Sequence, residues 1–164
     1  MEGDGYMITI HARFDLSHGD FTDVNTLLEK VGLNRGGRVQ RTIDQKVIDY
    51  CQPYVPASPD RTLEFSAQLS TEIGSGQVVW NTPYAHYQYM GIVYGPNIPE
   101  IDPETGVLLG FWSIPGKKKH PTDKRLTYDQ AQNPLAGAYW FERMKADQLN
   151  DILEEARKAV MQRE

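Results

Sequence analysis

Cysteine is almost absent from this chain, and so are long apolar runs. Its 164 residues include one cysteine, Cys51, which cannot form an internal disulfide, so the fold does not depend on an oxidising compartment. No run approaches the roughly 20 apolar residues of a membrane span, and the acidic start MEGDG lacks the basic region of a secretory signal. The sequence therefore predicts no membrane-spanning or targeting segment and fits a protein assembled in the cytosol.

A surplus of basic residues is also missing. The formal net charge is -5 at pH 7, whereas dedicated nucleic-acid binders usually carry a basic surplus. Apolar residues make up 40% and charged residues 24%, which excludes the disordered class. A chain of this length buries about 70% of its unfolded surface, which is enough for a real core. We therefore expect one compact domain over residues 1–164.

Specific catalytic and metal-binding motifs are absent as well. The chain has no phosphate-binding glycine loop, no paired-cysteine metal site and no HExxH helix. Its histidines lack ligand spacing, and scattered histidines are more often solvated or hydrogen-bonded than bound to metal. We therefore predict no metal, no cofactor and no enzymatic activity. The histidines are His11, His18, His86 and His120.

Periodicity predicts the elements of the first third of the chain. Strict alternation from Tyr6 to Leu16 predicts a long strand with one buried face. Thr22 or Asp23 can cap a helix that reaches Val31, where a following glycine would end it or kink it.

A second helix is predicted from Val39 to Cys51, where apolar residues recur every four positions. It ends where Pro53 and Pro56 remove backbone donors. Cys51 could in principle act with His86 as nucleophile and base. Its place in the apolar repeat instead favours a small buried hydrophobe.

Glycines and prolines mark the turns that follow. Residues 63–73 and 77–81 predict two strands, joined into a hairpin by the Gly-Ser-Gly turn at 74–76. Thr82, followed by a proline, predicts the start of a short helix that Gly91 closes.

The stretch 92–134 contains six prolines and predicts a long loop or arm, in which residues 107–114 could form a strand. A last helix is predicted from Tyr139 to Met161. The order of elements predicts an α+β fold, in which helices pack on an antiparallel sheet and a long proline-rich loop precedes the C-terminal helix. The predicted core face of that helix comprises Trp140, Met144, Leu149, Ile152, Leu153, Ala156 and Val160.

A basic stretch interrupts the proline-rich segment. Residues 116–125 contain five basic residues and one acidic residue, a local charge of +4. A lysine run is usually solvated, and the aromatic residues beside it either anchor an interface or cover the core as part of a strand. The stretch could contact DNA phosphates or an acidic partner. The candidate subunit-interface or DNA-contact residues are Phe111, Trp112, Lys117, Lys118 and Lys119.

Four segments carry a family resemblance that spans roughly residues 24–162. They read GGRVQRTIDQKVIDYCQPYVP at 36–56, IGSGQVVWNTPYAHYQYMG at 73–91, RLTYDQAQNP at 125–134 and AGAYWFERMKADQLNDILEEARKAV at 136–160. Together they resemble the minor capsid proteins of phages and prophages of Gram-positive bacteria, which are similar to the tail-completion proteins of phage necks. The chain departs from the family pattern at 58–63, where the usual glycine is missing.

The resemblance implies a structural protein of the virion, assembled in the host cytoplasm and located at the head-to-tail neck. It implies a ring of identical copies around the DNA channel, with neighbouring connector, neck and tail proteins as partners and a possible non-specific contact with DNA. It implies no membrane partner and no catalytic residue.

Three alternatives remain open from the sequence. The chain could occupy another station of the virion, as a tail terminator or a head decoration protein. It could be a small hydrolase or transferase that uses Cys51, His86 or Tyr87 in a deep pocket. It could also be a DNA-binding accessory module that uses the basic stretch.

Overall fold

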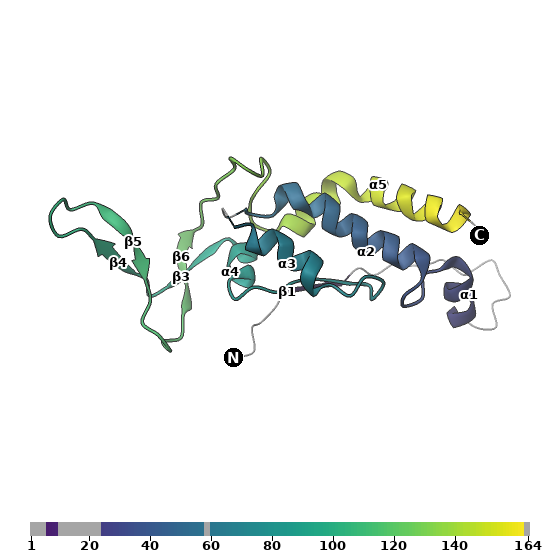
Figure 1. The fold of residues 1–164 in the computed structure, drawn as a ribbon, viewed down its shortest axis with the longest axis horizontal. Helices are drawn as coiled ribbons and strands as arrows, with labels where there is room; N and C mark the ends of the chain where they lie inside the picture. Colours follow the sequence, from purple (N-terminus) through teal and green to yellow (C-terminus); the bar gives the residue numbers. More distant parts are fainter. Residues whose placement is uncertain (1–5, 10–23, 58–59, 163–164) are drawn as a thin grey trace.

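The computed structural model describes residues 6–9, 24–57 and 60–162. Helices gather in an elongated body, and a thin arm of paired strands extends from one end of it (Figure 1). Helices beside antiparallel strands confirm the predicted α+β class. The elements are β1 (Tyr6–Thr9), α1 (Val24–Val31), α2 (Arg38–Cys51), the 3-10 helix η1 (Gln52–Tyr54), α3 (Thr62–Ser70), β2 (Gln77–Trp80), α4 (Ala85–Met90), β3 (Ile92–Gly95), β4 (Ile98–Ile101), β5 (Leu108–Trp112), β6 (His120–Arg125) and α5 (Trp140–Met161).

The core lies where α2, α5 and β2 meet. Val47 and Cys51 of α2 are fully buried there, as are Trp140 and Met144 of α5. The ring of Trp140 stands edge-on to Trp80 of β2, with 5.7 Å between the ring centroids. The prediction that Cys51 is a small buried hydrophobe is confirmed, and the helix that carries it ends just before Pro53, as predicted.

The predicted core face of α5 is correct only in part. Trp140, Met144 and Ile152 are buried as predicted. The side on which Ile152 and Ala159 lie, seven residues apart, is buried, whereas three predicted core residues on the neighbouring side are 39–44% exposed. No described element covers that side, and this explains the error. The exposed residues are Leu149, Leu153 and Val160.

The predicted hairpin across 63–81 is wrong, because its first half is the helix α3. The sequence alternates in polarity, but the buried side chains follow a helical spacing. They are Leu63, Glu64, Ser66 and Ala67. Phe65, which a strand would have buried together with Leu63, is exposed. Only β2 of the predicted pair is a strand.

The partner of β2 is β1, which runs antiparallel to it with Tyr6 opposite Trp80. The N-terminal strand is thus confirmed over β1. The rest of that prediction, 10–16, lies outside the described residues, and so do the proposed helix caps Thr22 and Asp23.

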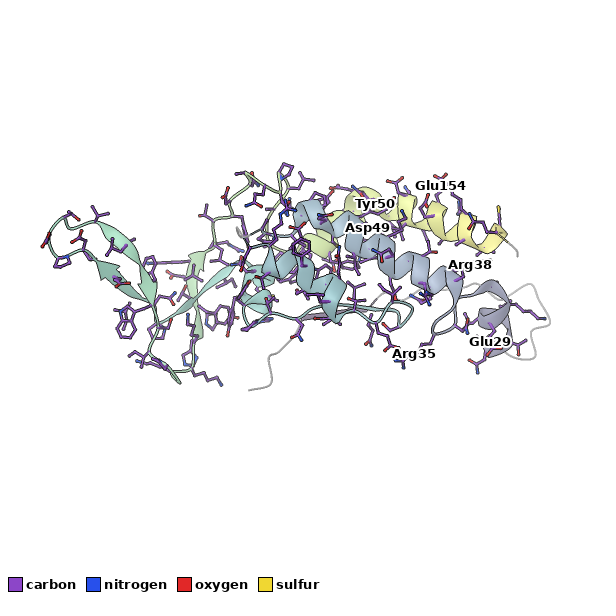
Figure 2. All side chains as sticks on the ribbon, viewed as in Figure 1. Glu29, Arg35, Arg38, Asp49, Tyr50 and Glu154 are labelled. Atoms are coloured by element: carbon purple, nitrogen blue, oxygen red, sulfur yellow. The ribbon has the colours of Figure 1, made fainter. Side chains whose placement is uncertain are left out.

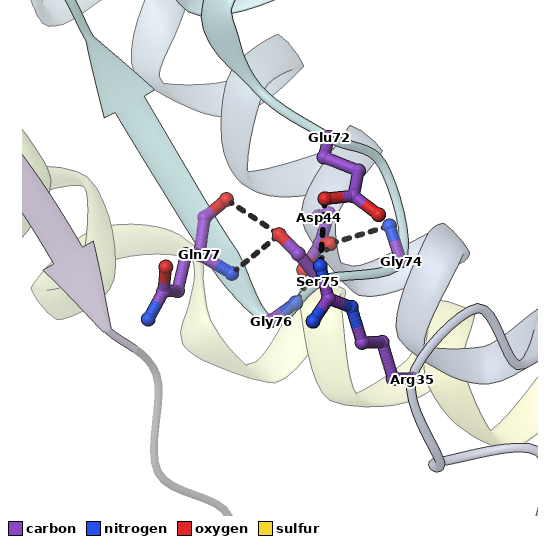
Figure 3. A network of polar contacts seen from close by, with 7 residues as sticks. All are labelled: Arg35, Asp44, Glu72, Gly74, Ser75, Gly76 and Gln77. Atoms are coloured by element: carbon purple, nitrogen blue, oxygen red, sulfur yellow. Dashed lines mark hydrogen bonds and ion pairs between the residues drawn. The ribbon is translucent and has the colours of Figure 1, made fainter.

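The glycine turn between α3 and β2 is held by a carboxylate from α2 (Figure 3). Asp44 is fully buried, and one of its oxygens accepts hydrogen bonds from the backbone N–H groups of Gly74 (2.7 Å) and Gly76 (3.1 Å). On the solvent side, Arg35 forms an ion pair of 2.8 Å with Glu72. The turn is therefore docked on α2 instead of joining two strands of a hairpin.

Replacing Asp44 by alanine should lower the free energy of unfolding by about 2–3 kcal/mol, because buried backbone donors lose a charged acceptor. The amide of Gln40, which donates to the same carboxylate at 2.8 Å, loses its partner too. The matched control is Asp49→Ala on the same helix, where the carboxylate is exposed and accepts one bond from Gln45. That change should cost less than about 0.5 kcal/mol. Equal losses in urea denaturation would refute the anchoring role of Asp44.

Candidate protein-interaction arm

The arm comprises residues 92–125 and is a two-stranded antiparallel ribbon with a bend in it (Figure 1). The chain runs out along β3 and β4 and returns along β5 and β6, so that β3 pairs with β6 and β4 pairs with β5. The predicted strand within 107–114 is present as β5. Pro96, Pro103 and Pro115 lie between strands. Apart from these turns, the part of the predicted loop without strands is confined to 126–134.

The bend of the arm is organised by Asn97. Its amide nitrogen donates to the carbonyl oxygen of Tyr94 (2.9 Å), and its amide oxygen accepts from the ammonium of Lys119 (2.9 Å) and from the hydroxyl of Ser113 (3.4 Å). These contacts join the outgoing and returning chains where the two strand pairs meet. Lys119 therefore helps to fix the bend.

The tip of the arm is closed by Asp102. Its carboxylate accepts hydrogen bonds from the backbone N–H of Glu104 (2.8 Å) and from the hydroxyl of Thr105 (2.6 Å). The bond from Thr105, followed by that from Glu104, lowers the pKa of Asp102. Gly106 adopts a φ of 68°, a conformation that glycine takes without strain. The tip is an ordered acidic turn.

The outer part of the arm, β4 and β5 with their flanking residues, exposes an unusual amount of apolar surface, which we call the apolar ribbon. Successive residues of a strand point to opposite faces, so Phe111 and Trp112 lie on opposite faces of the ribbon. Both are exposed, so neither face is covered. Large exposed apolar patches mark interaction sites. The apolar ribbon consists of Ile101, Val107, Leu108, Leu109, Phe111, Trp112 and Ile114, which are 43–65% exposed.

The structure places the five predicted interface residues in two groups. Phe111 and Trp112 belong to the apolar ribbon, on β5. Lys117 and Lys118 follow in the exposed turn toward β6, whereas Lys119 is half-buried against the bend. Four of the five side chains are thus exposed along one arm.

The contacts that join the arm to the body could not be predicted from the sequence. Tyr94 of β3 packs against Tyr87 of α4 with 4.4 Å between ring centroids, and against His86 at 6.2 Å. On the returning side, the hydroxyl of Tyr128 donates to the carbonyl oxygen of Gln88 (2.6 Å). The repeated aromatic residues before and after Gly91 were the available signal.

The returning chain is fastened to the end of α2 by Asn133. This buried side chain donates to the carbonyl oxygens of Val55 (2.8 Å) and Gln52 (3.0 Å). Nearby, the backbone N–H of Gly137 donates to the carbonyl of Tyr54 (3.1 Å). Asn133 thereby satisfies carbonyl groups at a helix end, which otherwise lack partners.

Replacing Gly91 by alanine should lower the free energy of unfolding by about 2–5 kcal/mol, because strain and overpacking add up. Its φ is 68°, and an added methyl group would lie 2.7 Å from the Cβ of Ala138 and 3.2 Å from the hydroxyl of Tyr128. Gly106 is the control, since its φ is also 68° but nothing lies within 4 Å. Gly106→Ala should cost at most about 1–2 kcal/mol. Thermal unfolding measures both losses. If Gly106→Ala were the more destabilised variant, the close packing at Gly91 would not determine the cost of substitution there.

A second basic surface was missed in the sequence. Arg38, Arg41 and Lys46 of α2 line an open groove of about 620 Å³, together with Thr42 and Gln45. Figure 2 shows Arg38 near the end of the body that is remote from the arm. The signal was a set of basic residues along one side of a predicted helix. This groove is a second place where an anionic partner could bind.

The catalytic alternative finds little support in the geometry. Cys51 has no exposed surface, and burial raises the pKa of its thiol, which disfavours the reactive thiolate. The rings of His86 and Tyr87 pack against each other, and both pack against Tyr94 at the root of the arm.

Neither a metal site nor a membrane span occurs in the described residues. Over 6–9, 24–57 and 60–162, no three His, Cys, Asp or Glu side chains are grouped so that they could hold a metal ion. In the same ranges, no helix is long and apolar enough to cross a membrane. Among known proteins, no family model, curated protein or solved structure matches the chain. The resemblance to phage minor capsid proteins stays a prediction from the four sequence segments.

Proposed function

We propose that this chain is a structural subunit of a tailed bacteriophage particle, a minor capsid or tail-completion protein at the head-to-tail neck. The observation that carries the proposal is the arm, which presents seven large apolar side chains with no cover in the described structure. Such a surface is costly in water and is typical of a protein that functions in contact with other proteins. The four segments that resemble minor capsid proteins specify the kind of assembly.

The division into body and arm suits a subunit of a ring. Head-to-tail contacts in a ring require two different surfaces on each copy, and an arm that reaches a neighbour while the body stays rigid can supply one of them. The proposed partners are further copies of the chain and the adjoining connector, neck and tail proteins. The subunit would be assembled in the bacterial cytoplasm and remain in the virion.

Contact with DNA is a secondary part of the proposal. A ring at the neck encloses the DNA channel, and phosphates attract exposed basic side chains without sequence preference. Two exposed basic surfaces are available, at Lys117 and Lys118 on the arm and at Arg38 and Arg41 on α2. A DNA-binding accessory module is the second candidate function. This function requires that the free chain binds duplex DNA with an affinity that falls steeply as the salt concentration rises.

Electron microscopy of particles that carry a labelled subunit tests the proposed station. A label fused after residue 164 should appear as a ring of density between capsid and tail. Unlabelled particles from the same host supply the control. Label on the capsid shell would indicate a decoration protein, and label on the tail alone would indicate a tail protein. Particles without any label would contradict a structural role in the virion.

A further inference from the structure

Charge is distributed unevenly along the arm. The tip carries Glu100, Asp102 and Glu104 and no basic residue. Residues 107–116, which contain most of the apolar ribbon, carry no charge. The turn at the base of the outer arm, 117–119, carries three lysines and no acidic residue, and β6 beyond it adds Lys124 and Arg125 against Asp123. The arm therefore changes from acidic through apolar to basic along its length.

The strands of the apolar ribbon also have open edges. Among the described residues, β4 and β5 pair with each other and with no other strand, so the outward N–H and C=O groups of both strands lack strand partners. A lone two-stranded ribbon is marginally stable in water, which favours further pairing.

The exposed area of the apolar ribbon approaches that of a protein interface. Seven large side chains that are each about half exposed offer on the order of 600 Å² of apolar surface in all, divided between the two faces of the ribbon. Each partner in a standard protein interface buries about 800 Å². The partner must cover an apolar surface and must meet an acidic end and a basic end. A second copy of the same arm meets these requirements when it is reversed.

We propose that two copies of this chain pair through their arms, which lie antiparallel so that the acidic tip of each meets the basic base of the other. A parallel arrangement would place tip against tip and base against base, which like charges oppose. The antiparallel arrangement is self-complementary under a two-fold axis, because each copy supplies the same surface. The inference concerns the purified chain before assembly, when the arm has no neighbour in a ring, and it goes beyond the neck assignment, on which it does not depend.

The dimensions of the ribbon allow both charged contacts at once. A strand of five residues, such as β5, spans about 17 Å. Two ribbons that overlap along this length place the tip turn of one copy beside the bend of the other. Lys117 and Lys118 follow that bend and are exposed, as are Glu100 and Glu104 at the tip. Asp102 and Lys119 are already engaged in closing the tip and the bend.

Charge reversal tests the pairing by sedimentation of the full chain at low ionic strength. The tip variant carries Glu100→Lys with Glu104→Lys, and the base variant carries Lys117→Glu with Lys118→Glu. In either homodimer, like charges meet at both ends, so we expect dimerisation to weaken by at least about 10-fold. An equal mixture of the two variants should form heterodimers with an affinity close to that of the wild type. A chain with all four changes should form homodimers again.

Body variants with the same changes of net charge serve as controls. Glu29→Lys with Glu154→Lys matches the tip variant, and Lys30→Glu with Arg157→Glu matches the base variant. These residues are exposed and lie on the body away from the arm (Figure 2 labels Glu29 and Glu154). The controls should dimerise like the wild type. Circular dichroism checks that each variant is folded.

A further variant probes the apolar contribution. Phe111→Ser should weaken dimerisation at both low and high salt, whereas the effect of charge reversal should fade as salt screens the tip and the base. Equal salt dependence of the two effects would contradict an apolar contact between the arms.

Several results would overturn the proposed pairing. A wild-type chain that is monomeric at all concentrations would show that the arm needs a different protein. Failure of the mixture to restore dimers, or equal weakening by the body controls, would exclude the antiparallel contact. These outcomes are distinct from failure of the neck assignment, which rests on labelled particles and not on the purified chain.

Discussion

Replacing Trp140 by alanine should lower the free energy of unfolding by about 3–5 kcal/mol. The side chain is fully buried, and its ring meets Tyr89 at 4.7 Å and Trp80 at 5.7 Å between centroids. Truncation would leave a cavity where α5, α4 and β2 converge, and such well-packed sites relax only in part.

Leu153→Ala on the same helix is the matched control for Trp140→Ala. Leu153 is 44% exposed, so its truncation should cost less than about 1 kcal/mol. Urea denaturation of both variants measures the two losses. Comparable losses would mean that the core is not centred on Trp140.

Excision of the outer arm should abolish infectious, tailed particles while the body still folds. Gly95 and His120 are cross-strand partners, so an Asn-Gly turn in place of residues 96–119 can close β3 onto β6. The shortened protein, which lacks residues 96–119, would be supplied to a phage that lacks the native gene. Because the apolar ribbon is exposed and packs on no core residue, its loss should leave the unfolding midpoint of the body nearly unchanged.

Two control measurements separate a defect in particle assembly from a defect in folding. The purified variant should unfold cooperatively at nearly the same urea concentration as the intact chain, which excludes misfolding as the cause of a defect. Intact protein supplied from the same vector should restore the yield of particles. A normal yield with the excised protein would show that the arm is dispensable and would remove the main support for its role in assembly.

Helices with a clear apolar period could be predicted from the sequence, whereas the segment before the glycine turn could not. In α2 and α5 the helical spacing has no competing alternation. In α3, the apolar residues at 63, 65, 67 and 69 fit a strand as well as a helix. Tertiary contacts decide between them, since Asp44 holds the glycine turn and β1 takes the position beside β2.

The outer features of the arm could be predicted, but its internal contacts could not. The sequence showed aromatic residues beside a lysine run and left open whether they anchor an interface or cover the core; the structure shows that they are exposed. The separate role of Lys119 was not, because it depends on Asn97, which is 22 residues away and meets it only once the strands pair. The exposure of Leu149 and Leu153 was missed for a related reason, since periodicity shows that a helix has an apolar side but not which neighbour covers it.

The two ends of the arm are rooted in different parts of the body, and this determines how a mechanical load would be carried. The outgoing chain starts from α4, where Tyr94 packs on Tyr87. The returning chain is bonded to α4 through Tyr128 and then, through Asn133, to the carbonyl groups just beyond α2. A force that pulls on the tip would therefore divide between these two anchors. Both anchors adjoin the core around Trp140, so the body would resist the pull as one unit and would not peel away one strand at a time.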